Sequence, residues 1–564
     1  MDGKTITTTL FTNGKIFLSG VAPGTNAGLH RPPTFASSIL IRGSKIQHVG
    51  SESDEPIATA LAQSVTVRDL QGKTVLPGFV DGHMHLMLLG QSLTKLDLGK
   101  CKSLDDIQAT IRAHAAANPD VERILCRGWM HSMTFPKQVA CADLDGLDVS
   151  GKDRPILIDT KDLHSAWLNT AGIKELGADR WADVPGGTIE RDEATGKVSG
   201  VFHEAANITY VWPYLAKVAT MEQRTDAIMA AVTAYHAAGY TGMIDMAMDQ
   251  GSWDALQEAL IKSAGKVPMR IAAYWLVKPG ETAADNLKQV ERAVELAREY
   301  NSKTTPDCRI VGVKVICDGI IDACTAGLSE PYSHNAHTEV PLWTAEQLEP
   351  VVKRATEAGL QVALHAIGDE TIRVVVDVLS RFAKPELRPR VEHIELASEA
   401  DAKRLGEFGI TSSIQPVHAD PAILRAWPKL LGEHRCKRAF PYRDFADGGS
   451  PLALGSDAPT APHSPLGNVY VSTTRRSYRE LEYETVVNGH FALGLCEAVA
   501  AGTEGAAYSC FDEGRIGRLE KGLKADFVVV DMEWEREKLV EANVVETWFD
   551  GERVYAAAAA AETE

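Results

Sequence analysis

The chain lacks the features that mark membrane, secreted and nucleic-acid-binding proteins. No apolar run approaches the ~18 residues that a membrane-spanning helix needs, and the N-terminus has no apolar signal core. The nine cysteines are odd in number and scattered, without any Cys-x-x-Cys, so no disulfide framework is expected. The net charge of −18 argues against nucleic acid or an anionic membrane as a partner. We therefore expect a cytoplasmic protein that acts on a small molecule. A homodimer is one assembly that the sequence allows.

The middle of the 564-residue chain alternates strand-like and helix-like segments. Helical periodicity is clear at 285–300 and at 344–358. Eight strands alternating with helices predict an α/β fold, the (β/α)8 TIM barrel, whose active sites lie at the carboxyl ends of the strands. The eight predicted strands are 75–80, 240–248, 269–277, 309–318, 361–368, 390–396, 410–416 and 451–459.

Short strand-like segments at both ends of the chain predict a second, smaller domain. We expect residues 1–75 and 509–556 to pair into one β-sandwich, and residues 76–508 to form the barrel. A connection at about 93–220 is far too long for a barrel loop, which predicts an insert after the first barrel strand. The alanine-rich end, 557–564, is expected to be a disordered tail.

Two histidines, His83 and His85, follow an apolar run that is broken by Pro77 and Gly78. Residues i and i+2 of a strand point to the same side, so both rings can bind one cation. Similar residues recur at the ends of other predicted strands, namely Lys314, His365, His393 and Asp457. A lone histidine in an apolar strand is more often a hydrogen-bonded core residue, but six such residues at five strand ends favour a metal site.

Imidazole and carboxylate ligands suit zinc, and also manganese, iron or nickel. An ammonium group cannot bind a metal. Burial beside cations lowers the pKa of a lysine, and its neutral amine can react with carbon dioxide to give a carbamate. A carbamate on Lys314 could bridge two metals; without it, Lys314 would lie close to a cation as a repelled charge, or only one metal would bind.

The six residues, in this chain order, resemble the ligand set of the amidohydrolase superfamily. The segments 162–169, 186–200 and 364–369 resemble its YtcJ-like branch, which includes N-substituted formamide deformylase. The similarity extends from about Leu10 to Tyr555, and residues 521–528 resemble the return into the superfamily's small sandwich domain.

The resemblance implies that His83, His85 and Asp457 bind one metal, and that His365 and His393 bind a second, with modified Lys314 as a bridge. It also implies hydrolysis of a carbon–nitrogen bond in an amide or N-formyl compound. Zinc would generate hydroxide near neutral pH, and Asp457 would serve as general base and acid. Hydrolysis of a cyclic amide, carbamate or ester, or a decarboxylation, is the alternative chemistry. A non-catalytic scaffold or signalling protein is the rival class, and loss of ligands would be its mark.

Several further residues are candidates for contact with the substrate. Asp369 is expected to orient His365. For the two tryptophans of this set, a role in the core of the insert is an equal alternative. The candidates are Trp129, His131, His164, Trp167, His203, Glu204, Asp318 and His418.

Overall fold

Eight parallel strands form one sheet in the order β21-β20-β19-β18-β17-β16-β15-β8. A parallel bridge between Met84 of β8 and Ala458, in the segment that follows β21, closes the sheet. This arrangement confirms the predicted (β/α)8 barrel. The strands are β8 (Phe79–Met84), β15 (Tyr240–Met248), β16 (Arg270–Val277), β17 (Cys308–Ile316), β18 (Gln361–Ala366), β19 (Arg390–His393), β20 (Thr411–Ile414) and β21 (Leu452–Leu454).

The computed structural model describes residues 7–19, 24, 32–63, 65–161, 165–184, 187–204, 206–333, 336 and 338–558. The chain divides into two compact units, one of residues 1–86 and 231–564, the other of residues 87–230. The second unit is longer at both ends than the insert of about 93–220 expected from the sequence. Within the described ranges, no helix has the length and apolar character to cross a membrane.

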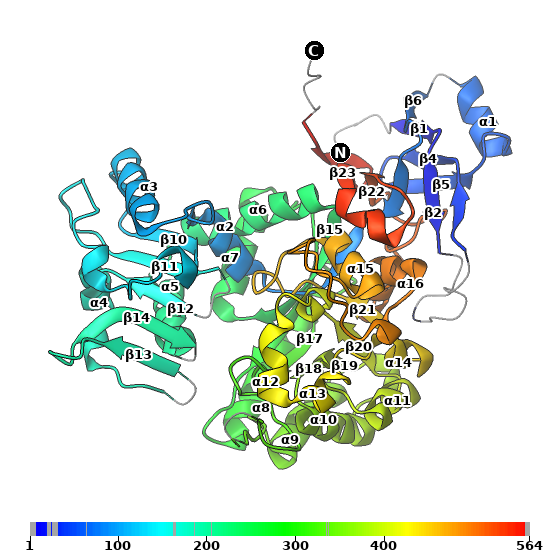
Figure 1. The fold of residues 1–564 in the computed structure, drawn as a ribbon. Coiled ribbons are helices and arrows are strands. Elements are labelled where there is room, and N and C mark those ends of the chain that lie inside the picture. Colours follow the sequence, from blue (N-terminus) through cyan, green and yellow to red (C-terminus); the bar gives the residue numbers. More distant parts are fainter. Residues whose placement is uncertain are drawn as a thin grey trace. The chain divides into compact units, whose positions relative to one another are not determined.

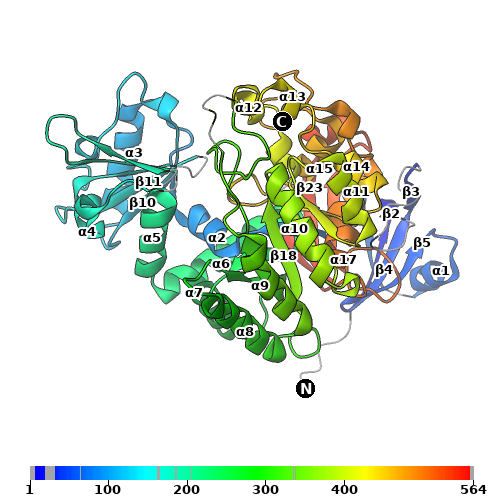
Figure 2. The ribbon, with the colours of Figure 1, turned by 90° about the horizontal axis from the view of Figure 1, so that it is seen from below.

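Helices follow the barrel strands, and α8, α9, α10 and α11 lie along the outer side of the barrel (Figure 2). Both helices expected from periodicity are present, as α8 and α9. Each begins at a capping box, formed by Thr282 for α8 and by Thr344 for α9. The helices of this unit are α1 (Glu55–Ala62), α7 (Gln250–Lys262), α8 (Ala283–Glu299), α9 (Ala345–Glu357), α10 (Asp369–Phe382), α11 (Glu399–Glu407), α12 (Trp427–Leu431), α13 (Glu433–Cys436), α14 (Tyr442–Asp447), α15 (Pro465–Thr474), α16 (Leu495–Ala500) and α17 (Ala506–Ser509).

The prediction of a single strand at 75–80 is wrong, because two strands that belong to different sheets meet within this range. Strand β7 (Thr74–Pro77) pairs with β22 and β2, whereas β8 begins at Phe79 and pairs with β15. The hydrogen-bond partners change at Gly78, whose N–H donates to Asp526 O, while the N–H of Phe79 donates to Gly239 O. A side chain at Gly78 would collide with Thr241, 2.2 Å from an added Cβ, so glycine is required where the chain changes sheets.

Both ends of the chain build the predicted β-sandwich, whose blue and red strands lie together in Figure 1. Phe11, Phe527 and Trp548 pack edge-on and stacked at its centre, with ring centroids 5.0–5.5 Å apart. One sheet contains β1 (Thr8–Thr12), β4 (Ser38–Arg42), β5 (Lys45–Gly50) and β6 (Thr66–Asp69); the other contains β2 (Lys15–Leu18), β3 (Thr34–Ala36), β7, β22 (Phe527–Asp531), β23 (Asn543–Phe549) and β24 (Glu552–Ala556).

The unit of residues 87–230 has its own six-stranded sheet and its own core. Trp129 and Trp167 have no exposed surface and pack with ring centroids 5.1 Å apart in that core. The complete burial of both indoles favours the core alternative over a substrate wall. The elements are α2 (Leu86–Thr94), β9 (Leu96–Asp97), α3 (Leu104–Ala117), β10 (Ile124–Trp129), β11 (Ile156–Thr160), β12 (Ser165–Leu168), α4 (Thr170–Leu176), β13 (Gly187–Arg191), β14 (Val198–Glu204), α5 (Trp212–Val218) and the first part of α6 (Met221–Ala238), which from residue 231 on belongs to the other unit.

Replacing Trp129 with alanine is expected to destabilise this unit by about 3–5 kcal/mol, because the change opens a large cavity in a closed core. Hydrogen exchange of the β10–β12 peptides measures the loss of local stability. Trp181→Ala, at a half-buried ring stacked on Tyr210, is the control and should cost less. Unchanged exchange together with altered substrate preference would instead assign Trp129 to substrate contact.

Candidate metal centre

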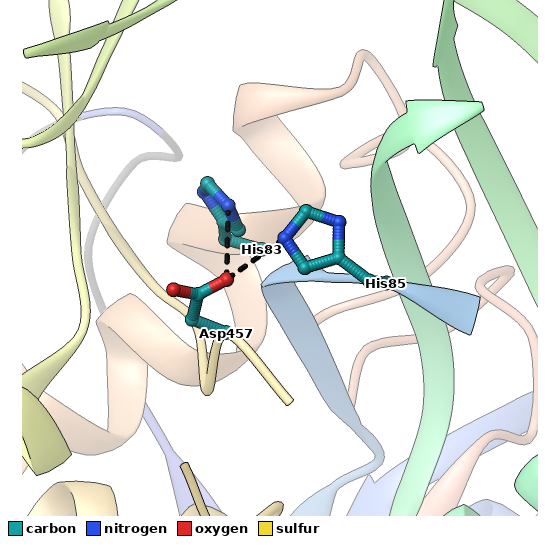
Figure 3. A group of neighbouring side chains, drawn as sticks. All are labelled: His83, His85 and Asp457. Atoms are coloured by element: carbon teal, nitrogen blue, oxygen red, sulfur yellow. Dashed lines mark ion pairs between the residues drawn. The ribbon is translucent and has the colours of Figure 1, made fainter. Parts of the chain in front are cut away.

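Two imidazoles and a carboxylate meet where β8 and β21 end (Figure 3). Asp457 Oδ1 lies 3.4 Å from His83 Nε2 and 3.0 Å from His85 Nε2. Backbone hydrogen bonds hold the two segments together, from Asp457 N to His83 O and from His85 N to Ala458 O. The structure thus brings together the three residues expected to share one metal.

Close backbone packing makes this convergence possible. An added Cβ at Gly82 would lie 2.5 Å from Leu454 O, and one at Gly455 would lie 2.4 Å from His83 N. Any side chain at either position would push β8 and β21 apart. The two glycines therefore bring the strand that carries His83 within reach of the turn that carries Asp457.

A buried hydrogen-bond chain sets the orientation of His83. Its Nδ1 lies 2.7 Å from Glu392 Oε2, and Arg390 binds the same carboxylate at 2.8 Å. Burial lowers the pKa of His83 to about 3, so the ring is neutral and its one proton lies on Nδ1, facing Glu392. Burial alone would raise the pKa of Glu392, but Arg390 and His83 hold it well below its usual range.

This tautomer leaves a lone pair on His83 Nε2, which faces the carboxylate oxygen Asp457 Oδ1 at 3.4 Å. Burial opposes ionisation of Asp457, but the hydrogen bond from the adjacent His85, at 3.0 Å, favours the carboxylate, and the pKa of Asp457 lies well below its usual range. Two acceptors facing each other in a buried site are unfavourable unless a cation lies between them. Ligand atoms 2.0–2.2 Å from one tetrahedral zinc are about 3.3–3.6 Å apart, so these residues fit a bound metal.

The turn that carries Asp457 is fixed by Asp81, a residue that the sequence analysis did not single out. Asp81 accepts hydrogen bonds from Ser456 N at 2.8 Å, Ser456 Oγ at 2.6 Å and the Tyr235 hydroxyl at 2.8 Å. Burial raises the pKa of Asp81 to about 6. The sequence gives one sign of the supporting roles of Asp81 and Glu392: each is a carboxylate within an apolar strand.

Lys314 lies at the end of β17 with 1% of its surface exposed. Its ammonium group has no hydrogen-bond partner among the described residues. Burial lowers the pKa of Lys314 to about 8, against the opposing charges of Glu392 and Asp457. A buried amine without a partner is chemically unusual, and it fits the expected carbamate.

His365 lies next to His393, with ring centroids 4.4 Å apart, but its Nε2 is 3.3 Å from both Asp318 Oδ1 and Gly319 O. Asp318 also accepts hydrogen bonds from Gly327 N and Gly368 N, so it fixes the loop before α10. The carboxylate beside His365 is therefore that of Asp318. The expected orienting residue, Asp369, begins α10, and its carboxylate instead accepts hydrogen bonds from the N–H and the Oγ of Ser329 in a neighbouring loop.

A second set of side chains lies next to Asp457. His418 Nδ1 is 3.2 Å from Glu395 Oε1, and His418 Nε2 is 3.5 Å from Asp457 Oδ2. The ring of His418 is nearly parallel to that of His393, with centroids 5.8 Å apart. Burial raises the pKa of Glu395. Sequence analysis included His418 only as a substrate candidate and missed Glu395, although it stands two residues after His393.

The remaining candidates belong to the insert unit. His131 is exposed, and its ring lies 5.9 Å from that of His203. His203 binds Ser165 Oγ through Nδ1 and Glu190 Oε1 through Nε2, at 2.8 and 2.7 Å. His164 and the side chain of Glu204 lie outside the described residues.

Three known proteins each match more than four-fifths of the chain. LONG AFTER FAR-RED 3 of Arabidopsis thaliana is 26% identical over 97% of this chain and 91% of its own length. YtcJ of Bacillus subtilis is 28% identical over 82% of this chain and 84% of its own. N-substituted formamide deformylase of Arthrobacter pascens is 24% identical over 92% and 94%.

The fold also matches a solved structure. An uncharacterized metal-dependent hydrolase from Pyrococcus furiosus superposes with a TM-score of 0.74, covering 93% of this chain and 99% of that one at 24% identity. The model of the amidohydrolase family matches residues 66–555. The resemblance read from the ligand pattern is thereby confirmed: the chain belongs to the amidohydrolase family.

Proposed function

We propose that this chain hydrolyses a non-peptide carbon–nitrogen bond, in an amide or N-formyl compound, with zinc held by His83, His85 and Asp457. One observation carries the proposal: in a buried site, His83 Nε2 lies 3.4 Å from Asp457 Oδ1 while His83 Nδ1 lies 2.7 Å from Glu392 Oε2. The similarity to N-substituted formamide deformylase supports the choice of bond. A panel of N-formyl amines, acyl amides, cyclic amides and esters, assayed with added zinc, tests the substrate class.

A bound zinc would lower the pKa of a water molecule and polarise the scissile carbonyl. Asp457, ionised and next to both imidazoles, is placed to accept the proton of the attacking water and to deliver it to the leaving nitrogen. Glu392 keeps the proton of His83 on Nδ1, so the lone pair of Nε2 is available to bind the metal. If the protein is instead a non-catalytic scaffold, it should turn over no substrate even when a metal is bound at these residues.

The purified protein is expected to contain zinc in stoichiometric amount, and chelation should abolish hydrolysis, with recovery on adding zinc. The reason is the pair of facing acceptors at His83 and Asp457, which only a cation stabilises. Elemental analysis beside an activity assay checks both statements. Active protein free of any transition metal would contradict the proposal, and metal without turnover on the panel would favour the scaffold alternative.

Asp457→Asn is expected to lower kcat by about 10²–10⁴-fold, because the amide keeps the shape of the carboxylate but cannot accept a proton. The assay is run with saturating zinc, and zinc content is measured in the same samples. Asp447→Asn, at a side chain that is 61% exposed on α14, is the matched control and should be unchanged. A variant at position 457 that keeps more than about a tenth of the wild-type rate would rule out this residue as the base.

Lys314 is expected to carry a carbamate in the metal-loaded protein, because its buried amine has no partner and can react with carbon dioxide. Protein loaded in ¹³C-bicarbonate should show one carbamate carbon resonance. Lys314→Met should remove that resonance, and Lys429→Met, at an exposed position on α12, should keep it. A wild-type spectrum without the resonance would leave Lys314 as an ordinary amine.

A further inference from the structure

One helix contributes to the interior of the barrel but has no part in the site described above. Residues 495–509 form a continuous helical run, made of α16, a π-helical segment (Ala501–Gly505) and α17, which we call the closing helix. Ala506 and Ala507, with Cys510 directly after the helix, lie in one buried apolar cluster with residues of β8, β15, β16, β18 and β21. The end of the closing helix is therefore part of the barrel core.

The last carbonyl groups of this segment bind side chains at the amino ends of barrel strands. Arg309 Nη2 donates to Cys510 O at 2.6 Å, and Gln361 Nε2 donates to Ser509 O at 2.9 Å. Arg309 is the second residue of β17, and Gln361 is the first residue of β18. The carboxyl end of a helix carries a partial negative charge, which a guanidinium group stabilises. The closing helix thus ends at the face of the barrel opposite to the metal centre.

Arg390 connects the end of the closing helix to that centre. Its Nη1 donates to Ser509 Oγ at 2.8 Å, and its Nε donates to Glu392 Oε1 at 2.8 Å. The other oxygen of Glu392 lies 2.7 Å from His83 Nδ1. The Ser509 hydroxyl donates its own proton to Ala506 O at 2.7 Å, so a lone pair of the same oxygen accepts from Arg390. Three successive hydrogen bonds therefore join the closing helix to an imidazole of the metal centre.

The guanidinium plane of Arg390 is fixed by acceptors on several sides. Besides Glu392, its Nη2 donates to Gly82 O at 2.7 Å and to Ser413 Oγ at 3.0 Å. Ser509 Oγ accepts from Nη1, and neither Ser509 nor Arg390 has exposed surface. Removing this hydroxyl would leave a buried, charged N–H without its acceptor, which is unfavourable. The guanidinium would then turn toward a new acceptor and disturb the carboxylate that orients His83.

We infer that Ser509 is a positioning residue for His83, and that docking of the closing helix is coupled to zinc binding through Arg390 and Glu392. The inference rests on the proposed function, since the coupled ligand is the zinc at His83. Contacts behind a metal ligand fix the orientation of that ligand and so set the affinity for the metal. Such coupling is reciprocal, so bound zinc must also stabilise the docked helix end.

A purely structural role for Ser509 is the alternative. The hydroxyl would then only help to hold the helix end in the barrel, as the hydroxyl of Thr503 does within the same helix by donating to Val499 O at 2.9 Å. This role predicts a less stable protein whose zinc affinity is unaltered. It also predicts that zinc gives the closing helix no more protection than it gives the other barrel helices.

Zinc affinity is measured on metal-free protein by competition with a chelator of known affinity. Ser509→Ala is expected to weaken zinc binding about 10-fold, the lower end of the loss for a contact behind a metal ligand. Thr503→Val is the matched control: it removes a buried hydroxyl of the same helix that has no contact with Arg390, and it should bind zinc as the wild type does. Thermal melting shows whether each variant is folded.

Hydrogen exchange supplies a second readout that uses the wild type alone and so stands even where Ser509→Ala does not fold. Added Zn²⁺ should increase the protection of peptides from 502–512 more than that of α8 peptides, because zinc binding and helix docking are coupled. In folded Ser509→Ala this difference should shrink, whereas Thr503→Val should keep it.

The outcomes separate failure of the inference from failure of the proposed function. Unchanged zinc affinity in folded Ser509→Ala overturns the inference, as does equal weakening in Ser509→Ala and Thr503→Val. Equal zinc-induced protection of 502–512 and α8 in the wild type also overturns it. A wild type that binds no zinc contradicts the proposed function, and the coupling with it.

Discussion

The centre of this protein depends on one buried hydrogen-bond chain, from Arg390 through Glu392 to His83. All three side chains are at most 1% exposed, and removing one member of such a pair typically costs about 3–5 kcal/mol. The chain fixes the proton of His83 on Nδ1 and thereby presents its other nitrogen to Asp457. Since Arg390 also binds Gly82 O at 2.7 Å, the same group ties β19 to β8 and couples barrel closure to the chemistry of the site.

The rest of the site follows from how tightly the first and last barrel strands approach. Gly82 and Gly455 let the backbones touch, and Asp81 clamps the turn at Ser456 that presents Asp457. Asp457 thus lies at a seam, with histidines from β8 facing one of its oxygens and His418 near the other.

Much of this could be predicted from the sequence, because β-strand periodicity and the carboxyl-end rule for barrels depend on local patterns. His83, His85, Lys314, His393 and Asp457 were found this way, and the structure brings them to the same end of the barrel. The division of 75–80 between two sheets was missed, since an unbroken apolar run does not reveal a change of hydrogen-bond partners at Gly78.

Tertiary contacts explain the other differences. Asp318, and not Asp369, lies next to His365, because loop packing before α10 decides which carboxylate comes near. The two tryptophans of the insert were equally compatible with a binding wall and a core, and only burial distinguishes them. Glu395 was missed because two left-handed residues, His393 and Ile394, turn it toward the site, and ordinary strand alternation gives no sign of that turn.

The most direct test of this account is anomalous diffraction at the zinc absorption edge from crystals grown with zinc. The account predicts one peak about 2.0–2.2 Å from His83 Nε2, His85 Nε2 and Asp457 Oδ1, with the proton-bearing Nδ1 of His83 still bound to Glu392. Anomalous density elsewhere, with His83 Nε2 and Asp457 Oδ1 still facing each other without a metal between them, would contradict it.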